Sequence, residues 1–186
     1  MNEITTVYDR FTELAKRAIV AARDAADSLH HDFIGTEHLL LGLAQTAGTA
    51  SEALRAHGLE ITRTRTAVED VLREADVPTS GGHSAADALS TLGIDVAEIQ
   101  QRADRNFGPG AFRYPRPAFS LQLKKVIQLS LHQVRELGGE RIDTEHLLLG
   151  LLAAGEDTIT RVLAELGIDP RALRQTVLDR TAQQTE

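Results

Sequence analysis

The sequence predicts an all-α protein built from two copies of a four-helix unit. The octapeptide TEHLLLGL occurs at residues 36–43 and again at 144–151, and the same offset of 108 residues aligns Phe11 with Phe119. Eight identities at one fixed offset indicate an internal duplication. Apolar residues recur at helical spacing in both copies, and no alternating strand pattern of useful length is present. We therefore expect a pseudo-twofold pair of duplicated four-helix units.

Each unit is expected to open with an amphipathic helix of about 18 residues, because its apolar side chains recur every three or four positions. In the first copy this stripe consists of Ala15, Ala18, Ile19, Ala22, Ala26 and Leu29. The aligned stripe in the second copy consists of Leu123, Val126, Ile127, Ser130, Val134 and Leu137. Both stripes predict a helix with one face in the core.

The octapeptide is expected to begin the second helix of each unit. Thr36 and Thr144 are suitable N-cap residues, because a threonine hydroxyl can accept a hydrogen bond from a free backbone N–H of the first turn. The leucines that follow at helical spacing form the inward face of this helix. Each copy therefore places its glutamate, Glu37 or Glu145, at the N-terminal mouth of a buried helix.

A third, short helix is expected to end at Gly58 in the first copy and at Gly167 in the second, where a left-handed C-terminal cap is typical. A fourth helix follows each glycine. In the second copy it is announced by Asp169 and Pro170, an N-cap residue followed by proline at the first helical position.

The chain is expected to divide into a first unit at 1–75, an inserted segment at 76–118 and a second unit at 119–186, together forming one compact domain. Within the insertion, residues 84–103 match 158–177 around a shared Leu-Gly-Ile-Asp and predict an extra helical hairpin.

An extended linker, NFGPGAFRYPRPAF, follows the predicted hairpin, because its glycines and prolines oppose helix formation. Its aromatic and basic side chains form a candidate partner-binding segment, or else they pack the linker back onto the two units. The candidate residues are Phe112, Arg113, Tyr114 and Arg116.

Composition narrows the functional classes. The 20 basic and 27 acidic side chains give a net charge of -7, which opposes nucleic-acid binding. No run of apolar residues is long enough to span a bilayer, no cysteine is present, and the first residues, MNEITTVYDR, do not resemble an export signal. We therefore expect a cytoplasmic monomer without nucleic-acid or membrane partners.

Catalysis is not expected from these motifs. Glu-His within the octapeptide differs from the H-E-x-x-H of zinc proteases, and the chain lacks the G-x-x-x-x-G-K-[ST] phosphate loop. The second copy has Gly138 and Gly139 where the first has His30 and His31, so a duplicated metal site would lose most of its ligands. We expect no enzyme activity, metal or cofactor. The alternative is a small metal-dependent hydrolase using His30, His31 and Glu37, which predicts bound zinc in the purified protein.

Ligand binding at the two glutamates is a stronger hypothesis. A carboxylate in the first helical turn stabilises the helix dipole by about 0.3 to 1 kcal/mol without any ligand. The alternative is a pocket in which the helix N-terminus attracts an anion while the carboxylate attracts a guanidinium in fork geometry. A ligand that carries a guanidinium and a phosphoryl group together satisfies both.

The doubled unit, an F-[TS] pair followed by I-x-T-E-H-L-L-L-G-L, a short helix and Leu-Gly, resembles the double Clp repeat. That is the N-terminal domain of the Clp AAA+ unfoldases, and the resemblance is closest to the ClpC branch. It covers about 11–75 and 119–180. Because no ATPase module follows, the chain resembles a stand-alone Clp N-domain protein.

The resemblance implies a docking platform of eight helices for protein substrates and adaptors of a Clp protease. In some ClpC-type domains the glutamate of each T-E-H motif reads phosphoarginine on proteins marked for degradation. Carried over to this chain, the candidate ligand-binding residues are Glu37, Glu145, Thr36, Thr144, Thr12 and Ser120. Asp143, which replaces the glycine usual before the threonine, is expected to repel a phosphoryl group in the second site.

The resemblance also implies an alternative function. Cyclic peptide antibiotics target ClpC-type domains of actinobacteria, so a free-standing copy is expected to be able to sequester such compounds as a decoy.

Overall fold

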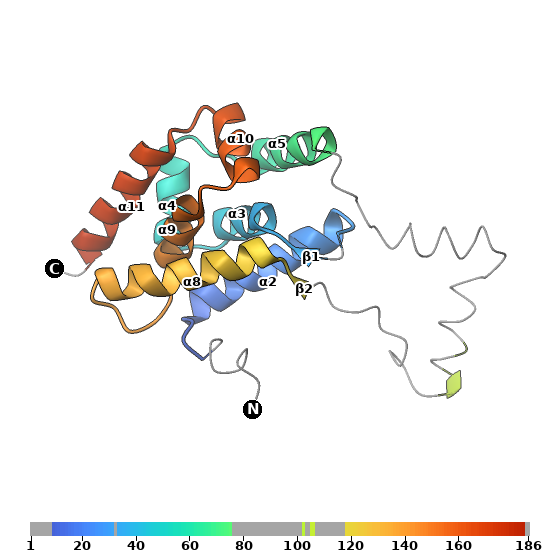
Figure 1. Cartoon of the computed structure of the whole chain (residues 1–186), viewed down its shortest axis with the longest axis horizontal. Coiled ribbons are helices and arrows are strands. Elements are labelled where there is room, and N and C mark those ends of the chain that lie inside the picture. Colours follow the sequence, from blue (N-terminus) through green and yellow to red (C-terminus); the bar gives the residue numbers. More distant parts are fainter. Residues whose placement is uncertain (1–8, 32, 76–101, 103–104, 107–117, 185–186) are drawn as a thin grey trace.

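The computed structural model describes residues 9–31, 33–75, 102, 105–106 and 118–184 (Figure 1). The first unit contains the helices α2 (Glu13–Ser28), α3 (Thr36–Gln45), α4 (Thr49–Ala56) and α5 (Ile61–Glu74). The second unit contains α8 (Leu121–Glu136), α9 (Thr144–Ala154), α10 (Asp157–Glu165) and α11 (Pro170–Gln184). The predicted hairpin at 84–104 and the linker candidates Phe112, Arg113, Tyr114 and Arg116 lie outside the described residues.

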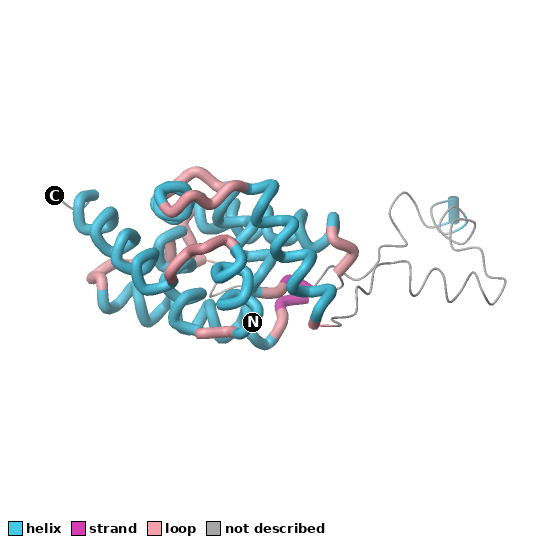
Figure 2. The backbone as a smooth tube through the Cα atoms, turned by 90° about the horizontal axis from the view of Figure 1, so that it is seen from above, coloured by secondary structure: helices cyan, strands magenta, loops and turns pink. Residues whose placement is uncertain are grey.

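The predicted duplication is confirmed at the level of whole helices. An offset of 108 residues maps α2 onto the bounds of α8, and it maps α3, α4 and α5 onto α9, α10 and α11 to within two residues at either end. Helices form most of the described chain in both units, as Figure 2 shows. The predicted all-α class is therefore correct, and the only strands within the described ranges are two short ones, β1 (Phe33–Ile34) and β2 (Ala118–Phe119).

The two short strands join the units crosswise. Strand β1 of the first unit pairs in parallel with β2 of the second, with Ile34 opposite Phe119. An isolated parallel bridge pairs Phe11 with Ile142, which are the residues that the 108-residue offset relates to Phe119 and Ile34. The segment before the first helix of each unit is therefore hydrogen-bonded to the segment before the second helix of the other.

The third and fourth helices of each unit also pack against helices of the other unit. Helix α4 packs against α11, and α10 packs against α5 (Figure 1). Polar contacts join the first pair, where His57 Nε2 lies 2.8 Å from Thr176 Oγ1 and Arg180 lies 3.0 Å from Glu52. Arg161 of α10 forms an ion pair with Glu74 of α5. Each unit therefore completes its packing with the last helix of its partner.

The octapeptide helices form the centre of the molecule. Their inward residues are at most 1% exposed, namely Leu39, Leu40, Leu41, Leu43, Leu147, Leu148, Leu149 and Leu151. Full burial of a leucine contributes roughly 1.5 to 3 kcal/mol. This concentration of buried leucine explains why both copies carry the same apolar run.

The glycine of the octapeptide allows its helix to approach the preceding one closely. A Cβ on Gly42 would lie 2.7 Å from the backbone nitrogen of Ala22, and a Cβ on Gly150 would lie 2.8 Å from the carbonyl oxygen of Val126. Both contacts are with backbone atoms, which cannot rotate away. Only glycine therefore permits the observed crossing of α2 with α3 and of α8 with α9.

Helix termini agree with most of the sequence predictions. Gly58 and Gly167 have φ values of +78° and +71°, as expected for left-handed C-terminal caps. Pro170 begins α11, and Asp169 Oδ1 accepts a hydrogen bond from the Arg171 N–H at 3.0 Å.

In the described ranges, no helix combines the length and apolarity needed to cross a bilayer.

The end of α2 differs between the units at one position. His30 has a φ of +59°, and its counterpart Gly138 has a φ of +71°. The same closing bond forms in both, from the His31 N–H to the Ala26 carbonyl at 2.9 Å and from the Gly139 N–H to the Val134 carbonyl at 2.8 Å. A left-handed conformation costs a residue with a Cβ roughly 1 to 2 kcal/mol, so the first unit is strained where the second is not.

We predict that Gly42→Ala destabilises the protein. Helix propensity alone would favour alanine by about 1 kcal/mol, but crowding against the Ala22 backbone is expected to cost about 1 to 3 kcal/mol. Thermal unfolding measures the difference. Gly150→Ala is expected to be partly rescued by Ser130→Ala, because the nearest atom in the second unit is the Ser130 hydroxyl. A Gly42→Ala protein that melts at or above the parent temperature would contradict the packing argument.

We also predict that His30→Gly raises the free energy of unfolding by up to about 1 kcal/mol, because glycine adopts the left-handed conformation without strain. The reverse exchange, Gly138→His, is expected to lower it by a similar amount. Chemical denaturation of the two variants tests both signs. Equal stabilities of all three proteins would show that backbone strain at this turn is negligible.

Candidate functional site

The candidate site is a pocket of about 230 Å³ at the N-terminus of α3, where the two units meet. Strand β1 and helices α3 and α5 line it from the first unit, while residues preceding and beginning α8 and α10 line it from the second. The lining residues are Phe33, Gly35, Thr36, Glu37, Leu72, Ser120, Gln122, Glu156 and Thr158. Three of the six predicted ligand-binding residues, Thr36, Glu37 and Ser120, therefore meet in one pocket.

The prediction that Thr36 and Thr144 are N-caps is wrong. Both are the first residues of their helices, and the N-cap residues are Gly35 and Asp143, which have extended backbones. The histidine of each T-E-H motif accepts a hydrogen bond from the N–H of this N-cap residue. His38 Nδ1 lies 2.9 Å from the Gly35 nitrogen, and the corresponding distance from His146 Nδ1 to the Asp143 nitrogen is 3.1 Å.

The two histidines thus have the structural role that glutamate or glutamine has in a capping box, where the third helical residue accepts from the N-cap N–H. Both histidines also pack into the interior, since His38 is fully buried and His146 is 6% exposed. The repeated T-E-H is accordingly a device for starting a buried helix.

The two threonines face different surroundings. Thr36 donates a hydrogen bond to Glu156, which comes from the second unit. Thr144 lies against Gly48, where an added Cβ would be 2.8 Å from its hydroxyl oxygen. Gly48 and Glu156 are related by the 108-residue offset, so an acidic side chain of the other unit reaches Thr36, whereas the equivalent position beside Thr144 is a glycine.

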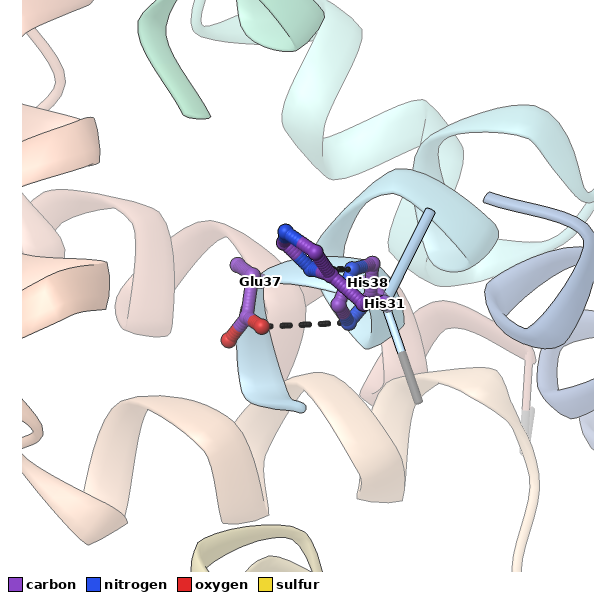
Figure 3. A group of neighbouring side chains, drawn as sticks. All are labelled: His31, Glu37 and His38. Carbon is purple, nitrogen blue, oxygen red and sulfur yellow. Dashed lines mark hydrogen bonds and ion pairs between the residues drawn. The ribbon is translucent and has the colours of Figure 1, made fainter. Parts of the chain in front are cut away.

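Glu37 lies deeper than the sequence predicts. Its residue exposure is 5%, and its carboxylate folds back over the N-cap, so that a Cβ on Gly35 would collide with both carboxylate oxygens. Figure 3 shows Glu37 beside His38. Glu37 Oε1 lies 3.1 Å from His38 Nδ1, yet this oxygen has no hydrogen-bond donor. A buried oxygen without a donor costs free energy, and a ligand that donates to it would remove that cost.

His38 Nδ1 has two neighbours and can satisfy one of them. With a lone pair on Nδ1, it accepts from the Gly35 N–H and leaves Glu37 Oε1 without a donor. With a proton on Nδ1, His38 instead donates to the Glu37 carboxylate and leaves the Gly35 N–H without an acceptor. Burial by itself raises the pKa of Glu37. In this second arrangement the contact with His38 lowers it, and together with the Glu37 backbone amide and the nearby His31 it brings the pKa below its ordinary value of 4.5.

The pKa of Glu145 is shifted in the opposite direction to that of Glu37. Burial raises its pKa above the ordinary value of 4.5; its own backbone amide opposes that shift, and the negative charge of Asp143 adds to it. Burial lowers the pKa of His146, although the charge of Asp143 acts to raise it. The lowered pKa keeps the ring neutral, so that Nδ1 can act as an acceptor. The Asp143 carboxylate accepts a hydrogen bond from the Thr144 N–H at 2.7 Å. The two identical octapeptides therefore carry glutamates with different charge preferences.

Thr12 and Ser120 cap the first helix of each unit. Thr12 Oγ1 accepts from the Ala15 N–H at 3.1 Å, and Ser120 Oγ accepts from the Leu123 N–H at 3.0 Å. Ser120 also lines the α3 pocket, whereas Thr12 is not part of its wall. Both hydroxyls thus have a structural function that accounts for the F-[TS] motif.

His31, Glu37 and His38 form a cluster of potential metal ligands. Their donor types suit zinc. However, both nitrogens of His38 already have partners, since Nδ1 faces the Gly35 N–H and Nε2 lies 2.9 Å from His31 Nδ1 (Figure 3). A metal bound by His38 would have to displace one of these contacts. The arrangement therefore fits a packed chain of hydrogen-bonded rings better than a metal centre.

The sequence did not single out Glu156. It enters the α3 pocket from a position 119 residues beyond Glu37, and it belongs to no motif. The only available signal was the offset itself, because the duplicated position in the first unit is Gly48, without a side chain. Gln122 and Thr158 also belong to no motif, so the sequence did not single them out either.

Comparison with known proteins agrees with the fold. The family model of the Clp repeat (R) N-terminal domain matches residues 10–84, 79–166 and 118–186. The chloroplastic chaperone protein ClpC1 of Oryza sativa subsp. japonica is 33% identical over 184 residues, which cover 98% of this chain and 16% of that protein. The chaperone protein ClpB of Oceanobacillus iheyensis is 32% identical over 172 residues, covering 92% and 17% respectively.

A solved structure shows the same architecture. The crystal structure of the N-terminal domain of the chaperone ClpD from Arabidopsis thaliana matches with a TM-score of 0.63 and 26% identity, covering 94% of this chain and 96% of that one. The chain thus covers 96% of that solved N-terminal domain but only 16% to 17% of the length of these curated relatives.

The opposite pKa directions of the two glutamates predict opposite effects of one substitution. Ionised Glu145 costs stability at neutral pH, so Glu145→Gln is expected to stabilise the protein there, with the gain disappearing in acid as the parent glutamate takes up its proton. Ionised Glu37 contributes stability above its ordinary pKa, so Glu37→Gln is expected to destabilise at neutral pH. That loss shrinks as the pH falls below 4.5.

Denaturant unfolding of both variants across this pH range measures the two profiles. Two variants that shift the midpoint in the same direction at neutral pH would contradict the assignment.

Proposed function

The chain belongs to the Clp repeat N-terminal domain family, and on that premise we propose that it is a non-catalytic recognition module for protein substrates or adaptors of a Clp protease system. Its proposed ligand is a guanidinium-bearing side chain, either arginine or phosphoarginine, which enters the α3 pocket. The α3 pocket is the preferred site, and the region around Glu145 is the weaker one.

One observation carries this proposal: Glu37 lines the pocket, and its buried Oε1 has no donor. A guanidinium presents five N–H donors in a rigid fork, and a charge-assisted hydrogen bond from it to a carboxylate is among the stronger contacts in proteins. The volume of about 230 Å³ is below the range of sites for drug-sized ligands, which begins at about 300 Å³, and it suits the end of one side chain.

Sequestration of cyclic peptide antibiotics stays a prediction. It differs from substrate docking in one respect that can be measured. A decoy would bind the antibiotic without any requirement for a basic side chain, whereas the proposed module requires a donor to Glu37.

The proposal is tested by calorimetric titration with three short peptides that differ at one position, which is arginine, phosphoarginine or glycine. At least one of the first two is expected to bind, and the glycine peptide is not. Glu37→Gln is expected to weaken that binding at least about tenfold, because it removes a charged acceptor.

Glu145→Gln is the matched control, since it changes the same residue in the same octapeptide and is expected to leave most of the affinity. Equal binding of the glycine peptide, or full binding by Glu37→Gln, would refute the proposed function. Loss of binding only in Glu145→Gln would assign the site to the second unit instead.

A further inference from the structure

We infer that the α3 pocket selects an unmodified arginine side chain and discriminates against phosphoarginine, with Glu156 as the specificity-determining residue. This inference rests on the proposed function, because it names the ligand that the same site prefers. It is carried by the charges, contacts and burial of the residues at the pocket wall.

The first argument is the sign of the charge. Two carboxylates, Glu37 and Glu156, line the pocket from the two units, and no basic side chain occurs among the described residues of its wall. Two carboxylates favour a cation and oppose any ligand that brings further negative charge. A phosphoryl group on the guanidinium would bring such a charge into the same space.

The second argument is that the anion position is already filled. The N-terminus of a helix attracts an anion through its free N–H groups and its dipole. Here the Glu37 carboxylate itself folds back over the N-cap Gly35, and its pKa is below the ordinary value, in part because its own backbone amide stabilises the charged form. A phosphoryl group would have to displace this carboxylate from the start of α3.

The third argument concerns the acceptors that remain. Glu37 Oε1 is enclosed without a donor, while Glu156 is positioned at the pocket by the Thr36 hydroxyl. A guanidinium can donate to both carboxylates at once because its N–H groups point in several directions. Phe33, whose ring stacks on His31, also lines the pocket, and arginine commonly stacks on aromatic faces. Arginine therefore fits this wall better than lysine, which carries one compact charge.

The second unit supplies a natural contrast. The position equivalent to Glu156 is Gly48, so no second carboxylate approaches the other threonine from across the interface. Selection by two converging carboxylates from opposite units is therefore a property of the α3 pocket, and Glu156 distinguishes it from its duplicate.

The test compares four peptides by calorimetry, identical except for arginine, phosphoarginine, lysine or citrulline at one position. Citrulline keeps the shape of arginine without its charge. We expect the arginine peptide to bind at least about tenfold more tightly than the phosphoarginine and citrulline peptides, and more tightly than the lysine peptide. Glu156→Gln, which retains an acceptor for Thr36, is expected to weaken arginine binding and to reduce or reverse the preference over phosphoarginine.

Glu165→Gln is the control, because it removes the same charge from an exposed position of α10 and is expected to change nothing. Circular dichroism melts of both variants establish that they are folded.

Tighter binding of phosphoarginine that depends on Glu37 would overturn this inference and leave the proposed function standing. Equal binding of citrulline and arginine, or an unchanged preference in Glu156→Gln, would also overturn it. If no peptide binds at all, the proposed function fails and the inference fails with it.

Discussion

The structure depends on reciprocal contacts between its two units, in which elements of each unit pair with or pack against elements of the other. Each unit's entry segment pairs with the other unit, and the last helix of each covers the third helix of the other. A unit of this size buries too little of its own surface to be comfortably stable, which gives a physical reason for the duplication. These contacts have a further consequence for function, because they bring side chains that are far apart in the sequence to one interface. The α3 pocket exists only because two units meet there.

Duplication preserved the local chemistry of the octapeptide while its surroundings diverged. In both copies the histidine accepts from the N-cap N–H and the leucines fill the centre, so the motif is explained by helix initiation and packing. The glutamate that precedes the histidine has no such fixed role. Beside Gly35 the carboxylate of Glu37 folds over the start of its helix, whereas beside Asp143 the charge of Glu145 is disfavoured. Burial raises the pKa of both glutamates, and the neighbouring groups separate them, because His38 and His31 lower the pKa of Glu37 while Asp143 raises that of Glu145.

This separation bears on how such domains acquire specificity. A helix N-terminus and a carboxylate can accept a zwitterionic ligand only when the carboxylate leaves the helix terminus free. In this chain Glu37 occupies that position itself, and Glu156 adds a second negative charge at the same wall. The resulting pocket is complementary to a cation. Family membership establishes the scaffold, and we propose that the side chains at the interface between its units determine which ligand it accommodates.

The sequence by itself determined the helices, the duplication and the capping glycines, because these follow from local spacing and from backbone preferences that act within a few residues. It placed the N-caps at Thr36 and Thr144, one residue too late, because a threonine hydroxyl was taken as the cap. The structure instead caps these helices with Gly35 and Asp143, whose N–H groups are accepted by the histidine three positions further on. Only the tertiary structure decided how deeply Glu37 is buried and that Glu156 joins its pocket. Burial and charge pairing across 119 residues arise from the packing of two units, and no periodicity within either unit records them.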